Sequence, residues 1–123
     1  MNLKDFTGVE YINLITYKKD KTPITTPVWV ADFSNSLVIT TSLNAGKVKR
    51  VRNNGQATIY ITNQSGSKKL SESLDLKASL IEDADLKKQA ADIIRKKYGM
   101  MAKMIMKGPD KNRAIIKLEE RRG

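Results

Sequence analysis

The residues best suited to hold a ligand lie where a predicted strand gives way to a short basic segment. Three hydroxyl side chains, Thr40, Thr41 and Ser42, close a run of strand-forming residues, and Gly46-Lys47-Val48-Lys49-Arg50 follows them. The amino end of a helix presents free N–H groups and partial positive charge, and Lys and Arg add charge-assisted hydrogen bonds. This grouping indicates a site for a phosphate monoester. The spacing does not fit a Walker A loop, and a solvated basic turn is the alternative interpretation.

A second candidate site is the segment Thr25-Thr26-Pro27-Val28-Trp29, which holds the sole tryptophan of the chain. Proline has no N–H to donate to a neighbouring strand, so Pro27 predicts an edge strand, a bulge or a bend. Such irregularities in a strand often lie beside a ligand. Packing of Trp29 in a core or at a dimer interface is the competing interpretation.

Acid–base and metal chemistry have little support in the residue types present. The chain contains no cysteine and no histidine, which excludes disulfides, Cys/His zinc sites and thiol or serine–histidine nucleophiles. The carboxylates form no convincing acid–base pair, because Glu82, Asp83 and Asp85 precede a predicted helix, where acidic residues favour the helix dipole. We therefore assign no catalytic residue and no metal ligand.

The elements that must position these residues are mainly strands. Runs of β-branched and aromatic residues bounded by turn residues predict strands over 11–17, 24–31, 37–41, 57–62, 76–81 and 113–119. The first three follow one another closely, with 32–36 as a turn, and predict a meander of neighbouring antiparallel strands. A short helix is expected over 47–52, because Val48 and Val51 would share one face and Asn53-Asn54-Gly55 would end it.

The second half of the chain adds helices before the last strand. Asp83 or Asp85 is expected to cap a helix that ends at Tyr98-Gly99, with apolar residues at helical spacing: Leu86, Ala90, Ile93 and Ile94. Residues 100–107 continue this helix or form a second one. The methionines of that stretch are interpreted as core or interface packing rather than a ligand pocket: Met100, Met101, Met104 and Met106. The order of elements predicts a small α+β, mainly β, barrel, and the lack of βαβ alternation argues against a doubly wound fold.

Composition fits one domain spanning residues 1–123, of the size at which single domains cluster. Lys and Arg total 23 against 13 Asp and Glu, a net charge of +10 that favours an anionic partner such as a phosphate ester, nucleic acid or a membrane surface. No apolar run is long enough to span a bilayer, and the first ten residues lack the apolar region of a signal peptide. We expect a soluble, cytoplasmic protein.

Taken together, the motifs resemble a known family. The chain is similar to the deazaflavin-dependent branch of the pyridoxamine-phosphate-oxidase-like proteins in these motifs: Leu14-Ile15-Thr16, Thr26-Pro27-Val28-Trp29, Thr40-Thr41, the segment Gly46 to Asn54, Ala78 to Asp83 and Lys97-Tyr98-Gly99. The resemblance covers most of the chain, from about Tyr11 to Leu118. The combination of Thr26-Pro27-Val28-Trp29 with Gly46-Lys47-Val48-Lys49-Arg50 is more specific than either motif alone.

The resemblance implies an FMN-binding-like split β-barrel that forms a homodimer, with FMN or the deazaflavin coenzyme F-420 in a groove at the dimer interface. The strand-end hydroxyls and basic helix would hold the cofactor phosphate, and the strand around Pro27 would run beside the ring. The implied cofactor-binding residues are Thr25, Thr26, Pro27, Val28, Trp29, Thr40, Thr41, Ser42, Lys47, Lys49 and Arg50.

Three functions follow as hypotheses. The first is an oxidoreductase that moves hydride between FMN or coenzyme F-420 and a small-molecule acceptor or donor, because the cofactor carries that chemistry and needs no protein nucleophile. The second is a non-enzymatic protein of the same fold that binds the cofactor without turnover. The third is a basic nucleic-acid-binding domain, disfavoured because aromatic side chains are not interleaved with the Lys/Arg cluster.

Overall fold

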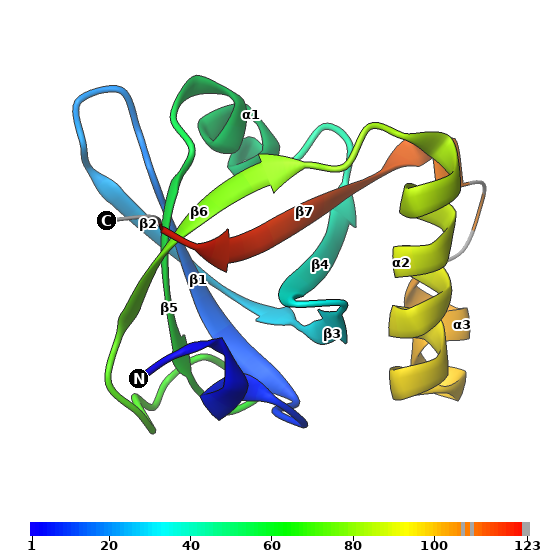
Figure 1. The fold of residues 1–123 in the computed structure, drawn as a ribbon, viewed down its shortest axis with the longest axis horizontal. Helices are drawn as coiled ribbons and strands as arrows, with labels where there is room; N and C mark the ends of the chain where they lie inside the picture. Colours follow the sequence, from blue (N-terminus) through cyan, green and yellow to red (C-terminus); the bar gives the residue numbers. More distant parts are fainter. Residues whose placement is uncertain (107, 109, 122–123) are drawn as a thin grey trace.

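The computed structural model describes residues 1–106, 108 and 110–121, and these form a wrapped antiparallel sheet with short helices (Figure 1). The strands are β1 (Tyr11–Tyr17), β2 (Pro23–Trp29), β3 (Ala31–Phe33), β4 (Ser36–Ser42), β5 (Gln56–Ile61), β6 (Leu74–Leu80) and β7 (Arg113–Glu120). The helices are α1 (Gly46–Asn53), α2 (Ala84–Tyr98) and α3 (Met100–Ile105), with short 3-10 turns at η1 (Leu3–Phe6) and η2 (Asp110–Asn112). This architecture confirms the predicted mainly β split barrel.

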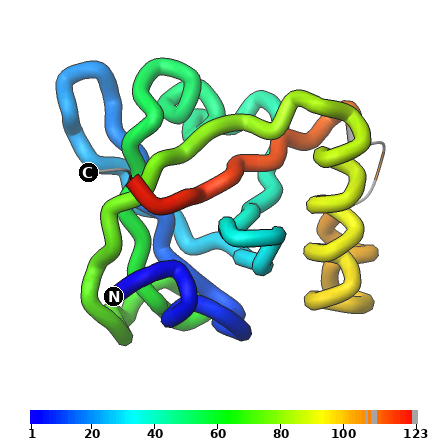
Figure 2. Tube along the Cα trace, viewed as in Figure 1, coloured from blue at the N-terminus to red at the C-terminus, as the bar shows by residue number. Residues whose placement is uncertain are grey.

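A single residue joins the two end strands of the sheet. Its order is β2-β1-β5-β6-β7-β4-β3, and every neighbouring pair is antiparallel. β2 and β3 lie at opposite ends of this order yet are consecutive in the chain, joined at Val30. The sheet must therefore curl so that its ends meet, which gives the half-open barrel visible in the Cα trace (Figure 2).

The barrel interior is filled by alternate side chains of the strands. Ile12 and Leu14 of β1, Ile59 of β5, and Ile116 and Leu118 of β7 are fully buried in one cluster. Burial of one such side chain stabilises the fold by about 1.5–3 kcal/mol. This cluster fixes the register of the strands, because a slip of one residue would turn these side chains outward.

A second apolar cluster lies between the outer face of the sheet and the helices α2 and α3. Val38 of β4 and Ile115 of β7 contact Ala90, Ala91 and Ile94 of α2 in this cluster. Asp83 caps α2 as predicted, since its side chain accepts a hydrogen bond from the N–H of Leu86 at 3.0 Å. Leu86 and Ile93, predicted on the apolar face, are instead exposed, so the buried face of α2 is narrower than the spacing suggested.

The predicted meander is wrong in two respects. The expected strand over 24–31 ends at Trp29, and Ala31–Phe33 forms β3 where a turn over 32–36 was predicted. In addition, β2 and β4 do not pair, because β7 occupies the position beside β4. The physical reason is barrel closure: the chain bends at Val30 to carry it from one end of the sheet to the other.

Candidate functional site

The start of α1 lies against the end of β4, as the phosphate-site prediction required. Lys47 donates a hydrogen bond from Nζ to Oγ1 of Thr41 at 3.3 Å, and Thr41 is buried. Ala45 occupies the N-cap position and supplies no side-chain hydrogen bond to the first turn of the helix. N–H groups at the start of a helix that lack a side-chain cap favour an anionic ligand.

Arg50 joins the same helix to β1 on the other side of the barrel mouth. Its Nε donates to Oγ1 of Thr16 at 2.6 Å, and Thr16 is only 1% exposed. A Cβ added at Gly46 would lie 2.8 Å from Nη1 of Arg50, so glycine allows the guanidinium to lie over the first turn of α1. The guanidinium is thus held by a strand hydroxyl beside the uncapped helix start.

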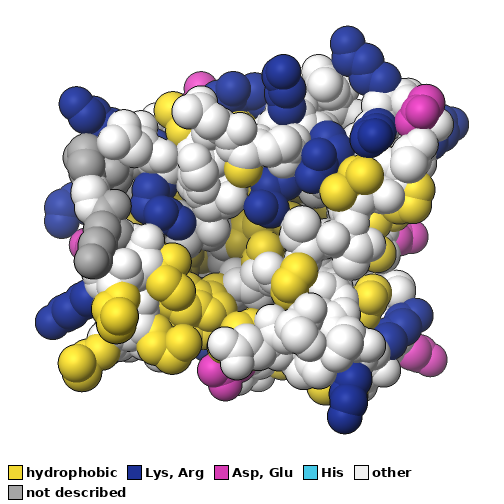
Figure 3. All heavy atoms as spheres, turned by 180° about the vertical axis from the view of Figure 1, so that it is seen from behind, with side chains coloured by type: hydrophobic (Ala, Val, Ile, Leu, Met, Phe, Trp, Pro, Cys, Tyr) yellow, Lys and Arg dark blue, Asp and Glu magenta, His cyan; other side chains and the backbone are white. Residues whose placement is uncertain are grey.

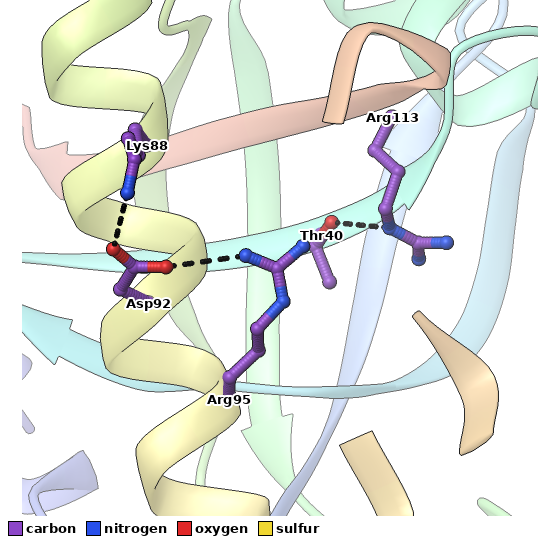
Figure 4. Close-up of polar contacts among 5 residues, drawn as sticks. All are labelled: Thr40, Lys88, Asp92, Arg95 and Arg113. Atoms are coloured by element: carbon purple, nitrogen blue, oxygen red, sulfur yellow. Dashed lines mark hydrogen bonds and ion pairs between the residues drawn. The ribbon is translucent and has the colours of Figure 1, made fainter. Parts of the chain in front are cut away.

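A third cation approaches the neighbouring hydroxyl of β4. Arg113, the first residue of β7, donates from Nε to Oγ1 of Thr40 at 3.0 Å (Figure 4). The Thr40 hydroxyl in turn donates to the carbonyl of Ala114 at 3.3 Å. Side chains from α1, β1, β4 and β7 therefore form three cation–hydroxyl pairs at one end of the barrel. We call Thr16, Thr41, Lys47 and Arg50 the anion cluster. Thr40 and Arg113 pair on the other face of β4, because consecutive strand residues point to opposite faces.

The anion cluster carries the positive charges of Lys47 and Arg50. Among the described residues, no Asp or Glu lies within ion-pair distance of Lys47 or Arg50. Burial lowers the pKa of Lys47, and the nearby charge of Arg50 lowers it further. By contrast, Asp92 on α2 pairs with both Lys88 at 3.3 Å and Arg95 at 3.2 Å (Figure 4). Uncompensated, partly buried cations favour a bound anion.

β2 lies at one end of the sheet, so the edge position predicted from Pro27 is confirmed. Thr26 and Val28 pair with Leu14 and Ile12 of β1 and share their inner face, whereas Pro27 and Trp29 point to the other face. β2 also contacts β4, so the two segments predicted to bind one ligand approach each other. Figure 3 shows this side of the molecule, with Lys and Arg side chains above a hollow that exposes hydrophobic side chains.

Not every predicted residue joins the anion cluster. Lys49 and Ser42 are exposed, and the Ser42 hydroxyl accepts a hydrogen bond from the N–H of Asn44 at 3.4 Å. Thr25 is exposed as well. Trp29 stacks on Tyr98 of α2, with ring centroids 4.3 Å apart and an interplanar angle of 8°.

Three contributors were missed from the sequence: Thr16, Arg113 and Tyr98. Thr16 carried a usable signal, because it is a polar residue at an inward position of an apolar strand. Tyr98 stands in one motif of the family resemblance, but that motif gave it no role in the site. Arg113 carried no signal, because its hydrogen-bond partner Thr40 is 73 positions away in the chain.

The methionines of α3 divide between core and surface. Met106 is buried, but Met100 is 79% exposed and Met104 70% exposed, and Met101 is also exposed. Core packing was therefore wrong for three of the four, although interface packing is not contradicted. The expected helix ends at Ile105, and Lys107 lies outside the described residues.

The described residues also bear on the predictions for metal ions and membranes. Within them, no three His, Cys, Asp or Glu side chains gather in a way that could hold a metal ion. No described helix is long and apolar enough to cross a membrane.

Residues 3–122 match the family model of pyridoxamine 5'-phosphate oxidase. The chain belongs to the pyridoxamine 5'-phosphate oxidase family. This family assignment agrees with the split barrel and confirms the resemblance at the family level. A search of curated proteins found no match.

Solved structures with different printed roles share this fold. HutZ, a haem storage protein from Vibrio cholerae, is 17% identical with a TM-score of 0.74, covering 98% of this chain and 89% of that one. A FAD-binding protein from Mesorhizobium loti is 13% identical with a TM-score of 0.70, covering 97% and 86%. A protein described as F420 reductase is 16% identical with a TM-score of 0.61, covering 92% and 87%. Identities this low support the common fold alone.

Proposed function

We propose that this member of the family is an oxidoreductase that binds FMN or coenzyme F-420 and transfers hydride to or from a small molecule. The observation that carries the proposal is the anion cluster: two cations, each held by a strand hydroxyl, beside an uncapped helix start. Neither cation has a carboxylate partner in the part of the chain that the structure describes. This donor set fits a phosphate group, since it offers charge, directed N–H groups and a fixed geometry. Both cofactors carry phosphate.

The proposed binding residues form two groups, one for the phosphate and one for the ring system of the cofactor. Lys47 and Arg50 would hold the cofactor phosphate, and the edge strand Thr25 to Trp29 would lie beside the ring system. The cofactor itself supplies the hydride chemistry, which agrees with a chain that has no histidine or cysteine. The protein contributes binding, orientation and exclusion of water.

A haem-binding role, suggested by the similarity to HutZ, has less support. Histidine and cysteine are two of the residue types that hold haem iron, and this chain has neither. The same absence does not weaken the flavin proposal, because flavin and deazaflavin cofactors need no protein ligand to a metal.

We also propose that the protein forms a homodimer through its exposed apolar surface. Met100, Met104 and Ile105 of α3 are each more than half exposed, which is unusual for large apolar side chains of a short helix. A second copy would cover them. Sedimentation of the wild type and of Met104→Lys tests this, with Lys19→Ala on the exposed first hairpin as control. The dimer is expected to dissociate only in Met104→Lys, and a monomeric wild type would contradict it.

Cofactor titration followed by absorbance and fluorescence tests the main proposal. Lys47→Ala and Arg50→Ala are each expected to weaken binding of FMN or coenzyme F-420 about tenfold or more, because each removes a charge-assisted hydrogen bond. Lys19→Ala changes the net charge equally but lies on the exposed hairpin, so it should leave the dissociation constant unchanged. Wild-type protein that binds neither cofactor would refute the proposal.

Gly46→Ala separates the site from the stability of the helix. The added Cβ would meet Nη1 of Arg50 and displace that flexible guanidinium, while alanine favours a helix over glycine. Cofactor binding should weaken although the protein loses no stability.

Two further outcomes decide between the remaining hypotheses. Cofactor binding without oxidation or reduction of any offered acceptor would favour the non-enzymatic protein. No cofactor binding together with salt-dependent affinity for DNA or RNA would favour the nucleic-acid-binding domain, for which the net charge of +10 is the supporting observation.

A further inference from the structure

The bend at Val30, where the two ends of the sheet meet, is held by side chains of α2. The N–H of Val30 donates to the Tyr98 hydroxyl at 3.0 Å, and Nζ of Lys97 donates to the Val30 carbonyl at 2.5 Å. The Tyr98 hydroxyl also donates to a backbone carbonyl, that of Glu10 at 2.5 Å or that of Val30 at 2.9 Å. Two adjacent side chains thus satisfy backbone groups that the bend removes from the sheet.

These contacts place Lys97 and Tyr98 in an unusually constrained environment for the end of a helix. Lys97 Nζ also donates to the carbonyl of Val9, so the last turn of α2 is tied to the chain on both sides of β1 and β2. Burial raises the pKa of Tyr98 to about 12, with hydrogen bonding to Val30 opposing the rise. The phenol therefore stays protonated at neutral pH and serves as a fixed donor and acceptor.

Trp29, the residue before the bend, takes its orientation from the same tyrosine. The indole and phenol rings stack at 4.3 Å between centroids and 8° between planes. Trp29 is only partly buried, so part of the indole remains open beside the edge strand β2. A stacked ring whose partner is itself hydrogen-bonded to the adjacent backbone has little freedom to rotate.

We propose that Tyr98, supported by Lys97, is a positioning residue that fixes the Trp29 indole as a wall for the cofactor ring. This inference rests on the proposed function, because it assigns Trp29 to the ring end of the same site. It also divides the site into two independent parts. The anion cluster on α1, β1 and β4 recognises phosphate, and the Trp29–Tyr98 stack recognises the planar ring.

The division is tested with two probes and matched variants. FMN and coenzyme F-420 report on the whole site, and inorganic phosphate, measured by calorimetry, reports on the anion cluster alone. Trp29 is the only tryptophan, so acrylamide quenching of the intrinsic fluorescence measures the exposure of this one indole. Tyr98→Leu removes both the stacking and the hydroxyl, Tyr98→Phe removes only the hydroxyl, and Lys97→Met removes only the amine.

Tyr98→Leu is expected to make Trp29 more accessible to acrylamide and to raise the dissociation constant of the cofactor about tenfold, with phosphate affinity unchanged. Tyr98→Phe and Lys97→Met should show smaller effects in the same direction. Lys47→Ala should show the reverse pattern, losing phosphate and cofactor affinity while quenching of Trp29 stays at the wild-type level.

Several results would overturn the inference. Wild-type cofactor affinity in Tyr98→Leu would refute the wall while leaving the proposed function intact. A loss of phosphate affinity in the same variant would show a general disruption instead of positioning. If Tyr98→Leu fails to fold by circular dichroism, Tyr98→Phe and Lys97→Met decide, and wild-type quenching and affinity in both would refute it. Wild-type protein that binds neither cofactor would refute both proposals together.

Discussion

Replacing Thr16 with valine should remove the hydrogen bond that positions Arg50 without opening a cavity. The hydroxyl accepts from Arg50 Nε at 2.6 Å, and Thr16 is 1% exposed, so valine fills the same space without the acceptor. A hydrogen bond to a charged group contributes about 1.5–3 kcal/mol. Arg50 is only half-buried and can regain water, so we expect the free energy of unfolding to fall by about 1 kcal/mol.

A double-mutant cycle in urea isolates this interaction from the other effects of each change. Thr16→Val, Arg50→Ala and their combination should give a coupling energy of about 1 kcal/mol. Lys49 provides the control, because it lies on the same helix but is exposed and outside the anion cluster. The cycle of Thr16→Val with Lys49→Ala should be additive within about 0.5 kcal/mol.

Comparing the two cycles shows whether Thr16 holds the Arg50 guanidinium in solution. If coupling to Arg50 is no larger than coupling to Lys49, the guanidinium is not held by Thr16 in solution. Gly46 would then have no fixed guanidinium to accommodate over the helix start, because its role depends on the same position of the Arg50 side chain. The two-state character of the unfolding must be checked with two spectroscopic probes before the energies are compared.

Three further outcomes are expected. Gly66→Ala should lower the free energy of unfolding by at least about 1 kcal/mol more than Gly8→Ala, measured in urea: both glycines have φ +76°, but only at Gly66 would a Cβ meet Asn13 Oδ1, at 2.8 Å. Lys47→Met should stabilise the protein by less than about 1 kcal/mol at pH 7. The folded pKa of Lys47 lies below 10.5, so between that pKa and 10.5 the unfolded chain binds more protons than the folded protein. Wild-type stability therefore rises with pH in this range, and the stability difference between Lys47→Met and the wild type narrows. The wild type should lose stability between pH 10 and about 12, because there the tyrosine ionises in the unfolded chain but not yet in the folded protein. Tyr98→Phe should lack this loss, and denaturation midpoints measured across that pH range test the difference.

Local patterns predicted the elements whose causes are local. The short basic helix forms because Val48 and Val51 share a buried face, and α2 begins where the Asp83 side chain can cap it. Pro27 correctly indicated an edge strand. The sequence also predicted that the end of β4 and the start of α1 lie together, and the hydrogen bond between Lys47 and Thr41, six positions apart, shows that they do.

Features that depend on barrel closure could not be read from the sequence. No glycine or proline marks the break at Val30, and the side chain that accepts the hydrogen bond from its N–H, Tyr98, lies 68 positions later. The exposed methionines of α3 have the same residue types and spacing as core residues, and only packing against the second cluster selects Met106 for burial. Long-range contacts thus determine the position of the break and the burial of Met106, because local propensity favours no particular outcome at either place.

The proposed phosphate site predicts that this chain, with its net charge of +10, prefers one kind of anion over many. Exposed lysines attract any polyanion, and salt at about 0.1 M screens this attraction at distances beyond about 10 Å. Lys47 and Arg50 differ because strand hydroxyls hold their nitrogen atoms beside an uncapped helix start. Fixed donors favour a small anion of matching geometry over an extended charged polymer. Raising the salt concentration should therefore weaken nucleic-acid binding steeply and cofactor binding only modestly, and equal salt dependence would argue against a built phosphate site.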